Sequence, residues 1–282
     1  MSLPDFMIIG SMKCGTSTLQ RQLVAQSGIF MTAPKEPSFF SDDRIYAKGF
    51  GWYSSLFSDA ASGDLKGEAS THYTKLPTYP KTLDRMKAVL KSPKIIYIIR
   101  NPIERAMSHF IHEWTESRMD NDLIKALNTH PELVEYGRYA MQITPFINQF
   151  GAENVLLSSL EQLKSRPEDE LQKIARFIGL EHTVRWDDGI GVQNVSSERT
   201  RRFLFQGLLI DNAPARMLRQ TLIPKSVRNK IRQQRSIKKL PELPNELRNK
   251  LEKVFLKDRE SLAKIFPAHP ALSLCYPNAK TA

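Results

Sequence analysis

Small, basic and hydroxyl-bearing residues are concentrated in one short segment near the start of the chain. It reads Gly10-Ser11-Met12-Lys13-Cys14-Gly15-Thr16-Ser17-Thr18 and lies between an apolar run, Phe6 to Gly10, and a segment with helical spacing, Thr16 to Gln26. A loop that joins a buried strand to a helix directs several backbone N–H groups at one point, where the helix dipole adds positive charge. Glycines let an anion approach the backbone closely. The segment therefore predicts an anion-binding site, with Lys13 as its charged side chain.

The spacing of this segment departs from that of ordinary nucleoside triphosphate loops, which read G-x-x-x-x-G-K-[ST]. Gly10 and Gly15 have the required separation, but Thr16 stands where the lysine of that pattern belongs. The strongest apolar run ends in Arg100 instead of an aspartate that would help to hold magnesium. A P-loop-type nucleotide-dependent kinase is therefore the alternative function, and these departures count against it.

A second anion site is predicted around Arg100. It follows Lys94 to Ile99, the most apolar run of the chain, which predicts a central parallel strand. Ligands of open α/β sheets bind at the C-terminal ends of the strands, and the planar fork of an arginine suits a phosphate. Ser108, two helical turns further on, is placed to face the same pocket. An ion pair between Arg100 and Glu104 explains the arginine equally well, and the spacing favours neither interpretation.

The elements that must position these residues alternate as strand, loop and helix. A third strand is expected over Asn154 to Ser158, followed by helical spacing through Leu171, Ile174 and Phe177. Pro102 is placed to begin the helix after the central strand. This order predicts an α/β fold: a P-loop-like central parallel sheet flanked by helices.

A single domain is expected over residues 1–282. We expect its α/β core in residues 1–180 and a mainly helical part in 181–282 that packs on this core. The helical part includes a long amphipathic helix from Leu243 to Phe266.

The charge of the chain is localised. The formal net charge is +11, from 41 basic and 30 acidic residues, but nine of the basic residues and none of the acidic ones fall between Arg216 and Lys239. This distribution excludes a polyanion-binding protein that is basic everywhere. The default interpretation of the 216–239 stretch is a solvated basic helix. The functional alternative is a surface that attracts an acidic acceptor, whereas aromatic residues that would support specific nucleic-acid binding are not interleaved there.

Several other classes of protein are also excluded. The apolar runs are too short to span a membrane, and the segment from Met1 to Phe6 lacks the features of a secretory signal. Cys14 and Cys275 are too few for a disulfide framework, so we expect reduced thiols and a cytoplasmic location. No His, Asp and Cys set shows metal-ligand spacing, and no metal is expected.

In combination, these segments resemble the sulfotransferases that use 3′-phosphoadenosine 5′-phosphosulfate (PAPS). Residues Gly10 to Leu19 are similar to the 5′-phosphosulfate-binding loop of that family, and Arg100 to Ser108 to its 3′-phosphate motif. Lys35-Glu36-Pro37-Ser38-Phe39-Phe40 resembles the K-E-P-x-F-F segment of the heparan sulfate sulfotransferase branch and its bacterial relatives. Gly67-Glu68-Ala69-Ser70 and Gly137-Arg138-Tyr139 also resemble segments of such proteins. The likeness runs through about Leu180 and extends more loosely to the C-terminal helix.

The resemblance implies a chemistry and a set of site residues. A sulfuryl group would pass from PAPS to a hydroxyl or amine of a carbohydrate, or of a lipid or carrier-bound acceptor, leaving 3′-phosphoadenosine 5′-phosphate (PAP). Glu36 is the implied base for the acceptor proton, with His72 as the competing base, and Lys13 would stabilise the charge on the departing phosphate. The other implied donor-binding residues are Cys14, Gly15, Thr16, Ser17, Thr18, Arg100 and Ser108.

The chain also departs from the family pattern. Heparan-type enzymes often read E-K-T-P where this chain has Glu68-Ala69-Ser70-Thr71, so the lysine that assists near the sulfuryl group is replaced by Ala69. Either Lys35 or another cation compensates, or the acceptor is held differently. Ser197 to Arg201 is faintly similar to the loop that closes over the nucleotide, which makes Arg199 and Thr200 further candidates for donor binding. The whole pattern is that of a bacterial-type enzyme without a membrane anchor.

Overall fold

A computed structural model describes residues 2–190 and 242–279. Within these ranges, five parallel strands form one sheet in the order β2-β3-β1-β4-β5. The strands are β1 Phe6–Gly10, β2 Ile29–Met31, β3 Leu65–Ala69, β4 Lys94–Ile99 and β5 Val155–Ser159. Because β1 and β4 lie inside the sheet with helices on both faces, their side chains are buried along almost their whole length. The predicted α/β fold with a central parallel sheet is therefore confirmed.

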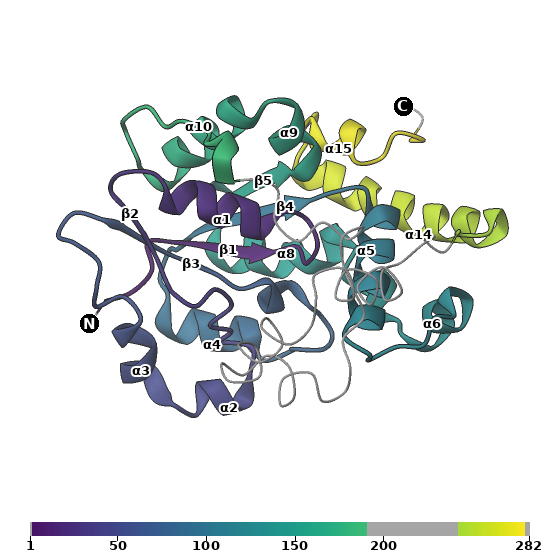
Figure 1. The fold of residues 1–282 in the computed structure, drawn as a ribbon, viewed down its shortest axis with the longest axis horizontal. Coiled ribbons are helices and arrows are strands. Elements are labelled where there is room, and N and C mark those ends of the chain that lie inside the picture. Colours follow the sequence, from purple (N-terminus) through teal and green to yellow (C-terminus); the bar gives the residue numbers. More distant parts are fainter. Residues whose placement is uncertain (1, 191–241, 280–282) are drawn as a thin grey trace, which may run out of the picture.

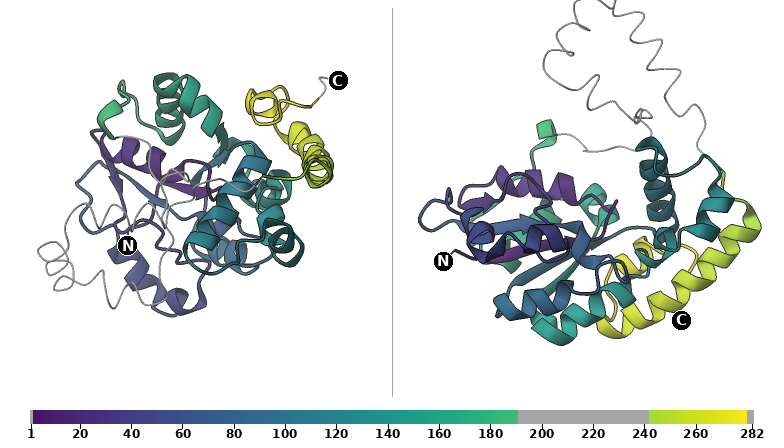
Figure 2. Two further views of the ribbon diagram at one scale, coloured as in Figure 1. Left: turned by 45° about the vertical axis from the view of Figure 1, so that its right-hand side comes forward. Right: turned by 90° about the horizontal axis from the view of Figure 1, so that it is seen from below.

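Helices cover both faces of the sheet, as Figures 1 and 2 show. On one face α1 (Thr16–Val24) packs against α10 (Pro167–Ile178), and on the other α4 (Thr82–Val89) packs against α8 (Tyr139–Phe150). The other longer helices are α5 (Pro102–Thr115) and α14 (Asn245–Ile265). The shorter helical elements are α2 Asp43–Tyr46, α3 Gly49–Ser55, η1 Thr71–Thr74, α6 Leu123–Thr129, α7 Glu132–Glu135, η2 Ala152–Asn154, α9 Leu160–Ser165, η3 Asp188–Ile190 and α15 Ala271–Leu274.

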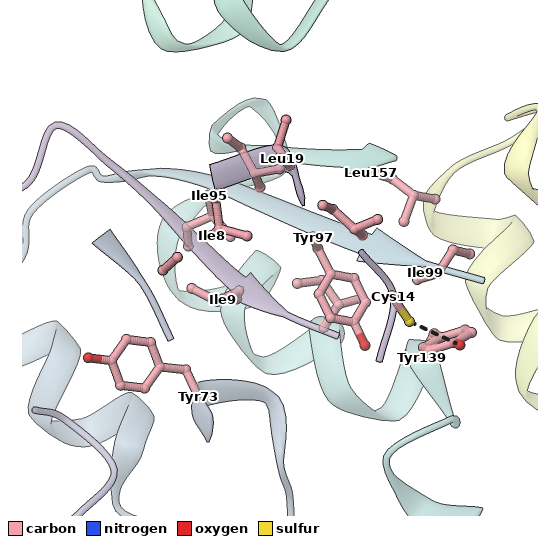
Figure 3. Close-up of a cluster of buried hydrophobic side chains, with 14 of the residues drawn as sticks. Ile8, Ile9, Cys14, Leu19, Tyr73, Ile95, Tyr97, Ile99, Tyr139 and Leu157 are labelled. Atoms are coloured by element: carbon pink, nitrogen blue, oxygen red, sulfur yellow. Dashed lines mark hydrogen bonds between the residues drawn. The ribbon is translucent and has the colours of Figure 1, made fainter. Parts of the chain in front are cut away.

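The core lies on both sides of β1 and β4, where side chains from the strands meet those of the helices (Figure 3). Ile8, Ile95 and Tyr97 are fully buried there. Leu19 of α1 lies on one face of the sheet, and on the other the Tyr97 ring lies 6.2 Å from the ring of Tyr139 of α8. Burial of this continuous apolar surface is the main force that holds the sheet and its helices together. It also gives the loops at the strand ends a rigid base.

The boundaries of the predicted elements are close to those observed. The helix expected from Thr16 to Gln26 ends two residues earlier, and the third predicted strand is shifted by one residue, to Val155–Ser159. The long C-terminal helix is confirmed as α14, and it packs against α8. Residues 191–241 lie outside the described ranges, so a mainly helical character is tested only for the rest of the C-terminal part.

Two strands, β2 and β3, were not predicted. β2 has three residues, too few for a periodic signal. β3 reads Leu-Lys-Gly-Glu-Ala, which has neither an apolar run nor regular alternation. It forms because both of its edges are paired, with β1 on one side and β2 on the other, so tertiary pairing outweighs its weak local preference.

Candidate active site at the C-terminal edge of the sheet

The parallel register brings the predicted site residues to one edge of the sheet. Strands β1, β3 and β4 end at Gly10, Ala69 and Ile99, and the register pairs Ile8 with Ala69 on one side and with Ile96 on the other. The loop after β1, the segment after β3 and Arg100 after β4 therefore leave the sheet side by side. This is the edge at which open α/β sheets bind ligands.

The loop after β1 is anchored to the sheet and folds back on itself. The Ser11 N–H donates to the Ile98 carbonyl at 2.7 Å, and the Cys14 N–H donates to the Ser11 carbonyl at 3.2 Å. Cys14, Thr16 and Thr18 are buried, whereas Lys13, Gly15 and Ser17 are partly exposed. The exposed members of the loop are thus the ones able to meet a ligand, and the buried members hold the loop in place.

Gly15 leaves the N-terminus of α1 open. It is the N-cap residue in a left-handed conformation, φ +89°, and it has no side chain to accept the N–H groups of the first turn, which also contains no acidic residue. At the start of α5, by contrast, the Asn101 side chain accepts from the N–H groups of Ile103 and Glu104. The N–H groups at the start of α1 can therefore donate to an anion, whereas those at the start of α5 already donate to Asn101.

The Cys14 thiol faces the core instead of the ligand side of the loop (Figure 3). Its sulfur lies 3.8 Å from the Tyr139 hydroxyl and 3.7 Å from the Met12 carbonyl. Burial raises the pKa of this thiol to about 11, so it stays protonated at neutral pH. The Cys14 side chain thus supports the loop from the core side, and a role of Cys14 in donor binding stays a prediction.

Arg100 contacts the same loop. Its Nη1 donates to the Lys13 carbonyl at 3.3 Å, and its backbone N–H and carbonyl both bond to the Tyr139 hydroxyl. The ion pair with Glu104 that the spacing allowed is also present, at 2.5 Å. Burial opposes the charge of Arg100, but the hydrogen bond that Arg100 donates to Glu104 and the nearby charges together outweigh burial and raise the pKa of the guanidinium. Ser108, two turns along α5, is buried.

Glu36 is held at this edge through the segment after β3. Its N–H donates to the Ala69 carbonyl at 3.0 Å, and its Oε2 accepts from the Thr71 N–H at 2.7 Å. The Thr71 hydroxyl and the Lys35 ammonium also contact the carboxylate. The side chain keeps 32% of its surface exposed. Glu36 is therefore both paired with Lys35 and oriented by Thr71, with room for an acceptor group beside it.

Lys13 and Glu36, the two residues expected to act in catalysis, both have a strained backbone conformation. Lys13 has φ +69° and Glu36 has φ +64°, a region that non-glycine residues rarely adopt. Such conformations cost roughly 1–3 kcal/mol and are retained where the surrounding structure holds a side chain for function. The strain therefore supports a functional role for these two positions.

His72, the competing candidate for the base, lies in η1 just after β3. Its ring stacks on Tyr79 with 4.9 Å between centroids, and its buried Nδ1 has no hydrogen-bond partner among the described residues. Burial, together with the nearby charge of Lys75, lowers the pKa of His72 to about 4. The His72 ring is therefore neutral at neutral pH. Glu36 remains the first candidate for the base because its carboxylate is partly exposed and is oriented by Thr71.

Two charged residues at this edge were not singled out from the sequence. Glu68 on β3 is fully buried, and Lys75, just after η1, keeps 8% of its surface exposed. Glu68 was quoted only within a segment that resembles the family, with no role of its own, and Lys75 was not quoted, because a glutamate or lysine normally indicates a solvated surface.

Some predictions lie outside the described residues. Arg199, Thr200 and the basic 216–239 stretch fall within residues 191–241, and their roles stay predictions. In the described ranges, no group of three or more His, Cys, Asp or Glu side chains is arranged to hold a metal ion. No helix in the same ranges has both the length and the apolar character needed to cross a membrane.

The sequence matches the family model described as "Sulfotransferase domain" over residues 3–265. It is 25% identical over 284 residues to the bifunctional heparan sulfate N-deacetylase/N-sulfotransferase 1 of Caenorhabditis elegans, a match that covers 93% of this chain and 30% of that protein. It is 29% identical over 191 residues to the heparan sulfate glucosamine 3-O-sulfotransferase 3B1 of Mus musculus, covering 64% of this chain and 47% of that protein. The chain thus spans less than half the length of these two relatives.

Solved structures show the same fold. A sulfotransferase from Alicyclobacillus acidocaldarius superposes with a TM-score of 0.69 at 22% identity, covering 96% of this chain and 99% of that one. The sulfotransferase domain of the Synechococcus PCC 7002 olefin synthase gives a TM-score of 0.51 at 19% identity, with 90% and 94% covered. At these identities the similarity extends to the arrangement of helices and strands.

Proposed function

Because the chain belongs to the sulfotransferase domain family, which it matches over residues 3–265, we propose that it transfers a sulfuryl group from PAPS to an acceptor hydroxyl or amine. The observation that carries the proposal is the position of the Glu36 carboxylate. It lies at the same sheet edge as the Lys13 loop and is oriented by Thr71. The match to a sulfotransferase family leaves the kinase alternative without support.

The residues of the loop would bind the donor. The open first turn of α1 and the exposed members Lys13, Gly15 and Ser17 would meet the 5′-phosphosulfate, while the buried Thr16, Thr18 and Cys14 keep the loop in shape. Arg100 and Ser108 would meet the 3′-phosphate, with Arg100 exchanging part of its contact with Glu104 for the ligand. Arg199 and Thr200 are further donor contacts under this proposal.

The transfer step assigns one role to each side of the site. Glu36 takes the proton of the acceptor hydroxyl, whose oxygen forms a new bond to sulfur. The bond between sulfur and the donor phosphate oxygen breaks, and its electron pair remains on that oxygen. Lys13 stabilises the negative charge that develops there. PAP and the sulfated acceptor are the products.

A carbohydrate is the acceptor we propose to test first, because both curated relatives are described as heparan sulfate enzymes. Lipid and carrier-bound hydroxyls are the other acceptors to be tried. The sequence-based expectation of a cytoplasmic location is a separate proposal.

The first prediction concerns Glu36. Glu36→Gln keeps the size and the hydrogen bond from Thr71 but removes the base, so transfer should fall by roughly 100-fold or more while PAP still binds. The measurement pairs calorimetric titration of PAP with transfer from labelled PAPS to a panel of glycan, lipid and carrier-bound hydroxyls. Glu181→Gln, at an exposed position, is the control. Near-wild-type turnover of Glu36→Gln would show that another residue is the base, and stabilisation of the wild type by ATP–Mg but not by PAP would refute the sulfotransferase function.

A further inference from the structure

Lys75 is a buried cation without a salt-bridge partner in the described part of the chain. It keeps 8% of its surface exposed, and its ammonium lies 5.8 Å from the centre of the Tyr136 ring. No carboxylate of residues 2–190 or 242–279 forms an ion pair with it. By contrast, Lys35 pairs with Glu36 and Arg100 pairs with Glu104. Because buried charges are normally paired, an arrangement of this kind indicates a functional role.

The backbone around Lys75 is fixed on both sides. The Thr74 hydroxyl donates to the Ile9 carbonyl at 2.8 Å, which ties the preceding residue to the strand that leads into the donor loop. The Gln142 side chain accepts from the Leu76 N–H at 2.8 Å and donates to the Leu76 carbonyl at 2.9 Å, which ties the following residue to α8. The position of Lys75 at the sheet edge is therefore set by the core.

Lys75 is linked electrostatically to the proposed base and, through its neighbour Tyr136, to the donor loop. The carboxylate of Glu36 is the charge that most strongly favours its protonated form, followed by Glu113, while Arg105 and Arg118 oppose it. Lys75 is in turn the charge that acts most on His72. On its other side, the Tyr136 carbonyl accepts from the Ser11 hydroxyl of the donor loop at 3.2 Å.

Burial lowers the pKa of Lys75 from 10.5 to about 8, because it disfavours the charged form. At pH 7 the ammonium is still mostly protonated. No anion contacts the Lys75 ammonium directly in the described part of the chain. Because the dielectric constant is low in a buried site, an anion brought into contact with this ammonium would be strongly stabilised.

We propose that Lys75 is a catalytic residue whose ammonium contacts the sulfonate oxygens as the group passes from the donor phosphate to the acceptor. The inference rests on the proposed sulfotransferase function and identifies the cation that compensates for Ala69. In this step Lys75 keeps all its protons. The sulfur–oxygen bond to phosphate breaks with its electron pair on the phosphate oxygen, the bond to the acceptor oxygen forms, and Glu36 receives the acceptor proton.

The test compares binding of two ligands that differ only in the sulfonate, PAPS and PAP, by calorimetric titration of the full chain. Lys75→Met replaces the ammonium by an uncharged side chain of similar length. It should weaken PAPS binding by roughly tenfold or more, the effect of one lost charge-assisted hydrogen bond, while PAP binding changes by less than about threefold. Lys75→Arg should recover part of the PAPS affinity. Lys91→Met, at an exposed position, is the control for removal of one positive charge.

The outcomes separate this inference from the proposed function. Equal loss of PAPS and PAP affinity, or no loss of either, would overturn the role of Lys75. A melting temperature of Lys75→Met well below that of the wild type would also overturn it, because removing an unpaired buried charge should not destabilise the fold. If wild-type protein binds neither PAP nor PAPS, the proposed function itself fails, whatever the variants do.

Discussion

At the scale of single residues, Glu68 shows how burial sets a charge at this site. Neither of its carboxyl oxygens has a hydrogen-bond partner among the described residues, and the hydroxyls of Tyr53 and Tyr73 have none either. Burial raises the pKa of Glu68 to about 7, although the two hydroxyls act in the opposite direction. The Glu68 carboxyl, which lies behind the segment that carries Glu36, is therefore partly protonated at neutral pH.

This burial predicts a pH-dependent stability. The folded-state pKa of Glu68 lies above the unfolded value of 4.5, so the folded protein binds more protons between those two values. Glu68 therefore contributes a fall of roughly 3 kcal/mol in total to the free energy of unfolding as pH rises from 4.5 through about 7. His72 and His109 oppose this fall, because burial lowers the pKa of each to about 4. Glu68→Gln has no titratable group at this position and should lack the Glu68 contribution. The free energy of unfolding of the variant, measured relative to that of the wild type, should therefore be higher at pH 8 than at pH 4.5.

Urea unfolding at several pH values between 4.5 and 8 measures this difference. Glu181→Gln is the matched control, because Glu181 is exposed and should keep the wild-type pH dependence. If Glu68→Gln keeps it as well, Glu68 is ionised in the folded protein and its burial has another explanation.

At the scale of elements, the junction between β1 and α1 depends on close approach as well as on conformation. A Cβ atom at Gly10 would lie 2.0 Å from the Thr74 hydroxyl oxygen, and one at Gly15 would lie 2.8 Å from Cδ1 of Leu160. The glycines therefore let η1 and α9 pack directly against the loop. This packing fixes the loop that we propose to bind the donor.

The matched pair Gly15→Ala and Gly63→Ala tests this packing. Both residues have a left-handed backbone, φ +89° and φ +92°, but nothing lies within 4 Å of a Cβ atom at Gly63. Each variant should lose roughly 1 kcal/mol of stability from the backbone. Only Gly15→Ala should lose a further 1–3 kcal/mol or so from crowding and also bind PAP more weakly. Equal effects on melting temperature and on PAP affinity would show that close approach at Gly15 is unimportant.

At the scale of the whole molecule, α14 is connected to the active site through α8. The buried Asp258 of α14 accepts from the N–H groups of Ala140 at 2.8 Å and Met141 at 3.2 Å. It caps the first turn of α8, where the N-cap residue Arg138 provides no side-chain hydrogen bond. The same turn carries Tyr139, whose hydroxyl donates to the Arg100 carbonyl at 2.8 Å. A residue far along the chain thus supports the Arg100 backbone.

Asp258→Ala should therefore affect both stability and donor binding. Loss of a helix cap costs about 0.5–2 kcal/mol, and here two buried N–H groups lose their acceptor. We expect a lower melting temperature together with weaker PAP binding through Arg100. Glu260→Ala, two residues away on the same helix and exposed, should change neither. Unchanged PAP affinity in a folded Asp258→Ala protein would show that α14 stabilises the fold without supporting the site.

The sequence by itself determined the features that depend on neighbouring residues. Local signals predicted the strands β1 and β4, the glycine loop after β1, and the helices that begin at Thr16 and Pro102. They could do so because burial on both faces and helix capping each determine the residue types within a few positions. The K-E-P segment around Glu36 was identified by its resemblance to a segment of the sulfotransferase family. The division of the chain near residue 180 and the individual site roles remain predictions.

Tertiary structure alone decided what depends on distant partners. Glu68 and Lys75 have no local signal, because their burial comes from β1, α5 and α8 packing around them, not from their neighbours in sequence. For Arg100, only packing shows that the guanidinium bonds both to Glu104 and to the Lys13 carbonyl, while phosphate binding by this residue stays a prediction. In the sequence, Asp258 is one of several acidic residues on an amphipathic helix. Its role as a cap of α8 is visible only in the packing of α14 on α8. Charge and hydrogen bonding in a core are set by which elements meet, and that information is absent from any short segment of the chain.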